Sequence, residues 1–122
     1  MALILIVDDE LSLTDFLEDA LLDVGFEVMK AGDGVRALHI ASVHHPDVVV
    51  TDFMMPMKTG LELTAEMRAD PALRDIPAIL TTGAQGAEVR GRADLFDAVF
   101  DKPYNLDSVV DVVRNLCEQN SQ

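Results

Sequence analysis

The residues of this sequence that could carry out chemistry each follow a short predicted strand. Val48-Val49-Val50-Thr51 ends at Asp52, and a comparable apolar run at residues 2–7 ends at Asp8 and Asp9. Continuous runs of this kind are typical of strands buried on both faces of a parallel sheet. Two further predicted strands, 77–81 and 97–101, are followed by Thr82 and Lys102. Because the carboxyl ends of parallel strands share one edge of a sheet, we expect these side chains to lie together.

The combination of groups indicates phosphoryl chemistry. Three crowded carboxylates repel one another, which raises the pKa of at least one unless a cation lies among them. Oxygen ligands in a partly hydrated site favour Mg²⁺ over zinc or copper. With an ammonium and a hydroxyl added, the site suits a phosphoryl group. Asp52 would be the nucleophile, the metal and Lys102 would neutralise the phosphoryl oxygens, and Thr82 would donate a hydrogen bond.

Each of these residues also has a purely structural interpretation. An aspartate after a strand often forms a turn, Asp8-Asp9-Glu10 could begin a helix, and a Lys-Pro pair is common in loops. Their coincidence at four strand ends favours the functional interpretation. The histidines do not converge in this way: His39 is expected on a helix surface, and His44-His45 at the opposite edge of the sheet. With no third ligand visible, we predict no metal site there.

Five strands and five helices are expected to alternate along the chain. The strands are predicted at residues 2–7, 26–29, 48–51, 77–81 and 97–101. A first helix should begin with a cap at Ser12 and end at Gly25. Its apolar stripe comprises Leu13, Phe16, Leu17, Ala20, Leu21 and Val24.

The remaining helices have their own end signals. Asp33 is a predicted N-cap for a helix at 35–43 that would face inward through Val35, Leu38 and Ala41. Thr59 and Glu62 predict a capping box for a third helix, with Leu61, Ala65 and Met67 among its apolar positions, ending before Asp70-Pro71. A fourth is predicted near 85–93, and a last one runs from Asn105 or Leu106, with Cys117 at the end of its stripe and a polar tail at 118–122. The pattern predicts an α/β fold, a doubly wound five-stranded parallel sheet of (βα)5 type.

Composition limits the function classes. The 122 residues predict a single domain over 1–122 with a core at about 3–117. A formal net charge of −13, from 22 acidic and 9 basic side chains, argues against direct nucleic-acid binding and fits a cation or a basic partner. No apolar run approaches the roughly 20 residues of a membrane helix, and no basic leader precedes the first strand. The single cysteine, Cys117, excludes an internal disulfide and indicates a reducing cytoplasm.

From Leu3 to about Cys117, the order and spacing of these motifs resemble a receiver domain of the two-component response-regulator family, which has a flavodoxin-like fold. The matching residues are Asp8-Asp9, Asp52-Phe53-Met54-Met55-Pro56 with Gly60, Thr82-Gly83 and Lys102-Pro103. Ala31-Gly32-Asp33-Gly34 and Asp70-Pro71 with Asp75-Ile76-Pro77 are similar to common family sequences.

The resemblance implies specific roles. Asp52 would accept a phosphoryl group from a phosphohistidine on a sensor histidine kinase or a histidine phosphotransfer protein. Asp9, Asp52 and the backbone carbonyl of Met54 would bind Mg²⁺, or Mn²⁺ in its place, with Asp8 assisting through water. Lys102 would pair with the phosphoryl oxygens, and its bond to Pro103 is often cis in this family. Thr82 would report phosphorylation to an output partner or effector domain at the surface of the fourth helix, fifth strand and last helix.

One position departs from the family pattern. Three residues before the lysine, the family often has an aromatic residue that swings inward, and Val99 stands there. By strand alternation Phe100 should point to the other face, so it cannot substitute. Valine is too short and too restricted for such a rotation, so we expect the adjustment to fall on residues 82–93.

Two other classes of protein could share this sheet. A phosphatase with an aspartyl nucleophile would have a second aspartate two residues later, where Met54 stands. A flavin-binding module would have a Ser, Thr and Gly-rich loop after the first strand, where this chain has three acids. The sequence therefore favours a signalling module that catalyses only its own phosphorylation and dephosphorylation. Whether it acts alone or as the front of a longer protein is left open.

Overall fold

All five predicted strands form one parallel sheet with the order β2-β1-β3-β4-β5. The computed structural model describes residues 2–55, 57–83 and 94–120. Its strands are β1 Leu3–Val7, β2 Glu27–Ala31, β3 Val48–Asp52, β4 Ala78–Thr82 and β5 Ala98–Asp101. Its helices are a 3-10 turn Leu11–Thr14, α1 Asp15–Asp23, α2 Gly34–His44, α3 Gly60–Ala69 and α5 Leu106–Asn120. The predicted fourth helix at 85–93, and nearly all of the segment expected to adjust, lie outside the described ranges.

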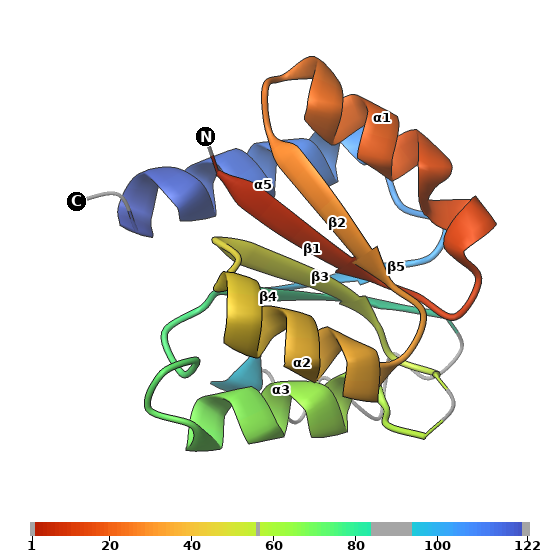
Figure 1. Cartoon of the computed structure of the whole chain (residues 1–122). Helices are drawn as coiled ribbons and strands as arrows, with labels where there is room; N and C mark the ends of the chain where they lie inside the picture. Colours follow the sequence, from red (N-terminus) through yellow and green to blue (C-terminus); the bar gives the residue numbers. More distant parts are fainter. Residues whose placement is uncertain (1, 56, 84–93, 121–122) are drawn as a thin grey trace.

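Helices cover both faces of the sheet, which confirms the doubly wound α/β prediction. Figure 1 shows α1 and α5 on one face and α2 and α3 on the other. The central strand β3 is buried at all five positions, as its unbroken β-branched run predicts. β1 and β3 are parallel neighbours in the sheet, with Val7 paired to Thr51, so their carboxyl ends lie side by side.

Most of the predicted helix ends are present. The Asp33 side chain accepts a hydrogen bond of 2.8 Å from the Arg36 amide. Thr59 and Glu62 form the predicted capping box, with bonds of 3.1 and 3.0 Å. Gly25, at a φ of 97°, occupies a left-handed conformation that favours glycine directly after α1.

Several predictions for the helices were wrong. Ser12 lies inside the 3-10 turn, and the N-cap position of α1 is Thr14, whose hydroxyl donates to the Leu11 carbonyl at 2.6 Å. The predicted stripe of α1 was too wide: the sheet covers Leu17 and Leu21, while Phe16 and Val24 are exposed. In α2, Val35 is exposed, whereas Ala41 is buried and Leu38 packs against the core, as predicted; Ala37 and Ile40 complete the inward face. The last helix runs to Asn120, so residues 118–120 of the predicted polar tail are helical.

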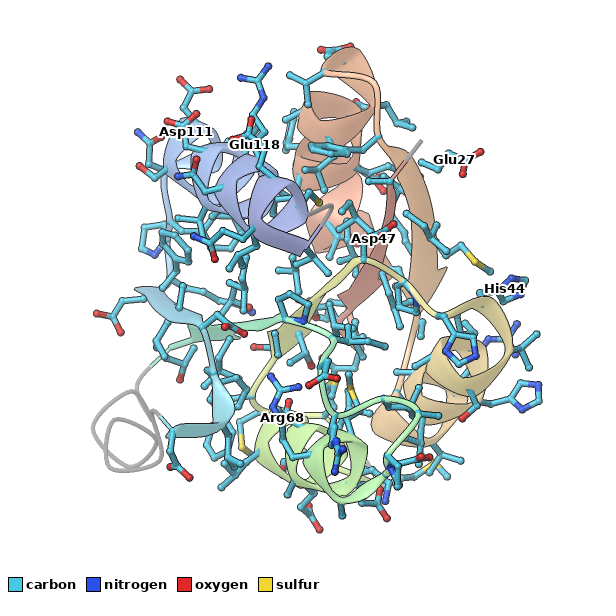
Figure 2. All side chains as sticks on the ribbon, turned by 90° about the vertical axis from the view of Figure 1, so that its left-hand side faces the viewer. Glu27, His44, Asp47, Arg68, Asp111 and Glu118 are labelled. Atoms are coloured by element: carbon cyan, nitrogen blue, oxygen red, sulfur yellow. The ribbon has the colours of Figure 1, made fainter. Side chains whose placement is uncertain are left out.

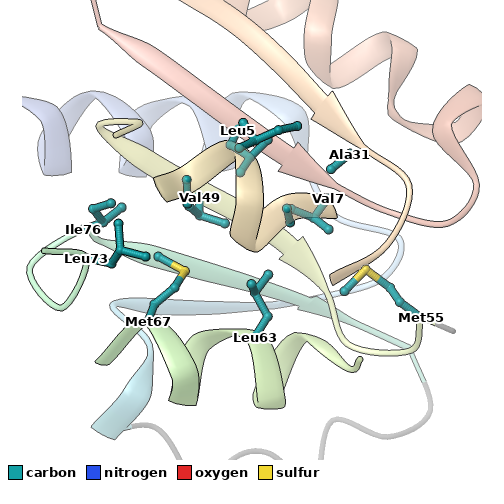
Figure 3. Packing of buried hydrophobic residues seen from close by; sticks show 12 residues of the cluster. Leu5, Val7, Ala31, Val49, Met55, Leu63, Met67, Leu73 and Ile76 are labelled. Carbon is teal, nitrogen blue, oxygen red and sulfur yellow. The ribbon is translucent and has the colours of Figure 1, made fainter. Parts of the chain in front are cut away.

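The core is divided between the two faces of the sheet. Figure 3 shows the cluster between the sheet and helices α2 and α3, where Val7 and Val49 face Leu63 and Met67. A second cluster, on the opposite face, joins β1 and β3 to α1 and α5. Val99 packs beside Leu80 and Phe96, whereas Phe100 belongs to the cluster under α1 and α5. Phe100 therefore faces away from Val99, as strand alternation predicted.

The edge of the sheet at which the strands begin lies opposite the edge that carries Asp8, Asp9 and Asp52. Figure 2 looks at this opposite edge and shows His44 there, as predicted, together with Asp47 and Arg68. No helix among the residues that the structure describes is long and apolar enough to cross a membrane.

Candidate functional site

Three carboxylates converge at the carboxyl edge of the sheet. Asp8 follows β1 directly, Asp9 is the next residue, and Asp52 ends β3. One oxygen of each lies within 4.8 Å of the others. Asp8 and Asp52 are buried, and Asp9 is exposed to solvent. This is the only group of possible metal ligands of this kind within residues 2–55, 57–83 and 94–120.

Asp8 is held by the backbone next to it. Its Oδ1 accepts a 2.9 Å hydrogen bond from the Glu10 amide, and its own amide donates to the Ala31 carbonyl at 3.1 Å. Burial raises the pKa of Asp8 above its usual value, and the nearby charge of Asp52 adds to this effect. The hydrogen bond from Glu10 and the charge of Lys102 lower the pKa but only in part compensate. Ionisation of Asp8 is therefore less favourable than that of an exposed aspartate, and a bound cation would favour it.

Lys102 supplies positive charge to the cluster. Its Nζ lies 3.0 Å from Asp52 Oδ1 and 3.5 Å from Asp8 Oδ2. Burial alone would lower the pKa of Lys102, but the hydrogen bond to Asp52 and the charges of both aspartates raise it overall. Its amide donates to the Thr82 carbonyl at 2.7 Å, and its peptide bond to Pro103 is cis, as the resemblance implied.

The backbone around Asp52 fixes one carboxylate oxygen. Oδ1 accepts a 2.9 Å hydrogen bond from the Phe53 amide in addition to the contact with Lys102. Gly60 at the start of α3 lies against the Asp52 carbonyl, where a Cβ would collide with it. Within the described residues, no hydrogen bond or ion pair involves Asp52 Oδ2, so this oxygen is available to a ligand.

Thr82 and Met54 follow or end strands at the same edge of the sheet as the cluster. Thr82 ends β4, and its fully buried hydroxyl has no hydrogen-bond partner among the residues that the structure describes. A buried hydroxyl without an acceptor is costly, which fits a group that binds a ligand oxygen. Met54 lies in the loop after β3 with an exposed side chain. The structure thus joins Asp8, Asp9, Asp52 and Lys102 directly, and Thr82 lies at the same edge.

The donor set fits a hard divalent cation. All the candidate ligands are oxygens, and one of the three carboxylates is open to solvent. Mg²⁺ usually binds through one or two carboxylates and keeps several waters, which a partly exposed cluster permits. The single ammonium of Lys102 cannot balance three carboxylates, so a bound cation would relieve their repulsion.

A cavity of about 510 Å³ adjoins the cluster, and no pattern in the sequence predicted it. Asp8 and Lys102 line it on one side, and Phe16, Pro103, Tyr104 and Leu106 form its apolar wall. Phe16 is 74% exposed although its spacing predicted a core position. A signal was available in the sequence. Phe16 lies at the margin of an over-wide apolar stripe, six residues after Glu10, the last of three consecutive acids. Tyr104 could have been found from its place two residues after Lys102.

Comparisons with known proteins agree with this geometry. The family model described as "Response regulator receiver domain" matches residues 4–114. The polar-differentiation response regulator DivK of Brucella abortus is 30% identical over 116 residues, which cover 93% of this chain and 94% of that protein. A probable transcriptional regulator, ycf29, of Pyropia yezoensis is 29% identical over 115 residues, and the chain spans only 52% of its length. The structure of the response regulator TrrA from Thermotoga maritima in complex with Mg²⁺-BeF has a TM-score of 0.84 at 30% identity, and covers 95% of this chain and 99% of that chain.

Proposed function

Since this chain belongs to the response regulator receiver domain family, we propose that it is the phosphoacceptor of a two-component phosphorelay, with Asp52 as the residue that is phosphorylated. The observation that carries the proposal is the position of the buried Asp52 carboxylate, 3.0 Å from Lys102 in a cluster with Asp8 and Asp9. We also propose that residues 1–122 form a single domain with a core at about 3–117, which is supported by their one continuous sheet. The protein would be a signalling module that turns over no outside substrate.

The two oxygens of Asp52 would have different tasks. Oδ1 is held by the Phe53 amide and Lys102, so Oδ2 would be the attacking atom. Oδ2 forms a bond to phosphorus while the bond from phosphorus to the leaving nitrogen of a phosphohistidine breaks. The electron pair of that bond stays on the imidazole nitrogen, and the product is an acyl phosphate on Asp52.

Mg²⁺ would be held by Asp9, Asp52 and the Met54 carbonyl, with Asp8 acting through water. When bound, such an ion neutralises phosphoryl oxygens and the repulsion among the carboxylates. This assignment is supported by the oxygen-only cluster of this chain and by the Mg²⁺-BeF complex named for TrrA. Mn²⁺ would serve in place of Mg²⁺.

Lys102 and Thr82 would stabilise the transferred group. The Lys102 ammonium, already 3.0 Å from Asp52, would exchange part of its contact with the carboxylate for a phosphoryl oxygen. The unpaired Thr82 hydroxyl would donate to another oxygen and so satisfy its own hydrogen bond. A shift of Thr82 would then carry the signal from the site to the surface near β5 and α5.

The donor would be a phosphohistidine of a sensor histidine kinase or a histidine phosphotransfer protein in the cytoplasm. The cavity beside Lys102 supports this partner because its apolar wall, formed by Phe16, Tyr104 and Leu106, suits an imidazole ring and the protein surface around it. An output partner or effector domain would bind at the face of the fourth helix, β5 and α5. The net charge of −13 supports the view that neither partner is a nucleic acid.

The test is phosphorylation by a small phosphodonor, followed by intact-mass spectrometry. Wild-type protein with donor and Mg²⁺ should gain one phosphoryl group, and the gain should be lost on chelation and in Asp52→Asn. Asp47→Asn, which removes an exposed carboxylate at the opposite edge, is the matched control and should still gain the group. Phosphorylation of Asp52→Asn to the wild-type extent would refute the assignment.

A further inference from the structure

The loop after β3, of which the structure describes residues 53–55 and 57–59, is anchored at both of its ends. At the far end, the Gly60 amide donates a 2.9 Å hydrogen bond to the Phe53 carbonyl, and Gly60 fits against the Asp52 backbone only because it has no Cβ. Nearer the beginning, Met55 is buried in the cluster that includes Val7 and Ala37. Asp52 is placed by its pairing with Thr81 in the sheet, so the conformation of this loop bears on where the Met54 carbonyl lies.

The middle of the loop is in an unfavourable conformation. Met57 has a φ of 72°, in the left-handed region that costs free energy for a residue with a side chain, and 76% of it is exposed. A conformation of this kind persists only when its surroundings determine it. The exposed Met57 side chain contributes little packing of its own, so the constraint must come from neighbouring residues. Lys58 is the nearest candidate, because it forms an ion pair with Glu66 on α3.

On its other side, Lys58 packs against Gly34 at the first position of α2. Gly34 is buried, and a Cβ at this position would lie 2.7 Å from Lys58 Cβ and 2.8 Å from the Lys58 carbonyl oxygen. The carbonyl oxygen is a backbone atom and Cβ is bonded directly to the backbone, so no change of the Lys58 rotamer could remove the collision. Figure 1 shows the segment between β3 and α3 passing beside the start of α2.

We propose that Gly34 is a positioning residue for the cation site, because only glycine there lets the 53–59 loop lie closely enough on α2. The contact acts through Lys58 and the strained Met57 on the orientation of the Met54 carbonyl. The three atoms nearest to a Cβ at Gly34 all belong to Lys58, and none belongs to the carboxylates or to Lys102. The inference rests on the proposed function, since it concerns the same cation site.

The chain contains a matched control for this proposal. Gly32 lies in the same turn, two residues earlier, and a Cβ there would meet nothing within 4 Å. Gly32→Ala and Gly34→Ala thus add the same methyl group to the same turn, with and without the contact to the loop.

Two measurements separate positioning from general stability. The Mg²⁺ dissociation constant is followed by fluorescence of the single tyrosine, Tyr104, which lines the cavity beside Asp8 and Lys102. Amide hydrogen exchange across residues 53–59 is measured without metal. Gly34→Ala should weaken Mg²⁺ binding by roughly tenfold or more, as loss of a supporting group around a metal site does, and should accelerate exchange in the loop. Gly32→Ala should match wild type in both.

The outcomes discriminate between the two proposals. Wild-type affinity and exchange in Gly34→Ala would overturn the positioning role, while absence of Mg²⁺ binding by the wild type would instead overturn the proposed function. The double variant Gly34→Ala with Lys58→Gly removes two of the three close contacts and also the ion pair with Glu66, so it is compared with Lys58→Gly alone and should bind Mg²⁺ nearly as tightly as that single variant. If Gly34→Ala alone does not fold, a double variant that folds and binds Mg²⁺ supports the proposal, and one that also fails to fold contradicts it.

Discussion

At the scale of single residues, the site has more negative than positive charge. Three carboxylates lie within 4.8 Å of one another, and among the described residues Lys102 is the only basic side chain paired with them. Two of these carboxylates are buried, where repulsion is screened less than at the surface. The metal-free site therefore costs stability and favours a cation.

Removal of one negative charge should relieve this cost. Asp9→Asn is expected to raise the melting temperature in chelator by roughly 2–4 °C, in the range typical of functional-site charges. The same variant should lose the stabilisation that Mg²⁺ gives to the wild type, because it lacks a ligand. Thermal melts with chelator and with MgCl₂ measure both effects. A variant that melts below wild type and still responds fully to Mg²⁺ would show that Asp9 is not a ligand.

Asp8 should make the metal-free protein sensitive to pH. Its pKa is raised from the usual 3.8 by burial, so the folded protein binds more protons than the unfolded chain above that pH. Stability must then fall as the pH rises through the interval between the usual and the raised pKa. Asp8→Asn lacks this titration but keeps an oxygen for the Glu10 amide. The stability of Asp8→Asn relative to wild type should therefore increase from about pH 3.8 upward. Urea melts at several pH values measure this difference. A relative stability that declines as the pH rises would contradict the expected effect of Asp8.

At the scale of elements, Arg68 on α3 connects segments that are distant in sequence. Its guanidinium donates hydrogen bonds of 3.0, 2.6 and 3.0 Å to the carbonyls of Arg74, Ile76 and Leu95. Asp97, 3.6 Å from the same group, also accepts from the Ala78 amide at the start of β4. Figure 2 shows Arg68 at the edge opposite the carboxylates, so its role is structural.

Substitution of Arg68 should destabilise the fold without affecting the cation site. Arg68→Lys keeps the charge, but one ammonium cannot serve three carbonyls in the fixed geometry of a guanidinium. The expected loss is about 2 kcal/mol in the free energy of unfolding. Arg114→Ala, at an exposed position on α5, should change it by less than about 0.5 kcal/mol. Equal effects of the two substitutions in denaturant melts would refute the role of Arg68.

Elements whose signals are local could be predicted from the sequence. The buried strand β3, the Asp33 cap and the Thr59 capping box all depend on neighbours within a few residues. The orientation of Phe16 could not be predicted, because it depends on how much of α1 the sheet and α5 cover. The contact between Gly34 and Lys58 joins residues far apart in the chain, and no spacing rule signals it.

At the scale of the whole molecule, the net charge of −13 acts against folding. Most of the carboxylates are solvated, so their repulsion should be screened by any salt. In chelator, NaCl should raise the melting temperature by a few degrees. MgCl₂ at matched ionic strength should raise it further, because it also binds at the cluster. If the two salts act equally, the stabilisation is screening alone and no specific cation site is filled.

The grouping of the candidate site residues was predictable because the topology is simple. Parallel strands bring all their carboxyl ends to one edge, so Asp8, Asp9, Asp52 and Lys102 could be grouped from sequence order alone. The cavity could not be predicted in this way, because its wall is assembled from α1 and the segment before α5. The orientation of Phe100, away from Val99, was predictable from strand alternation. The two side chains pack in different clusters.

The central claim is that Asp52 carries the phosphoryl group, and chemical trapping tests it most directly. Borohydride reduces an aspartyl phosphate to homoserine, so peptide mass spectrometry after donor treatment identifies the modified residue. The account predicts homoserine at position 52 in wild-type protein treated with phosphodonor and Mg²⁺, and none when either is omitted. Homoserine at Asp8 or Asp9, with Asp52 unchanged, would contradict it.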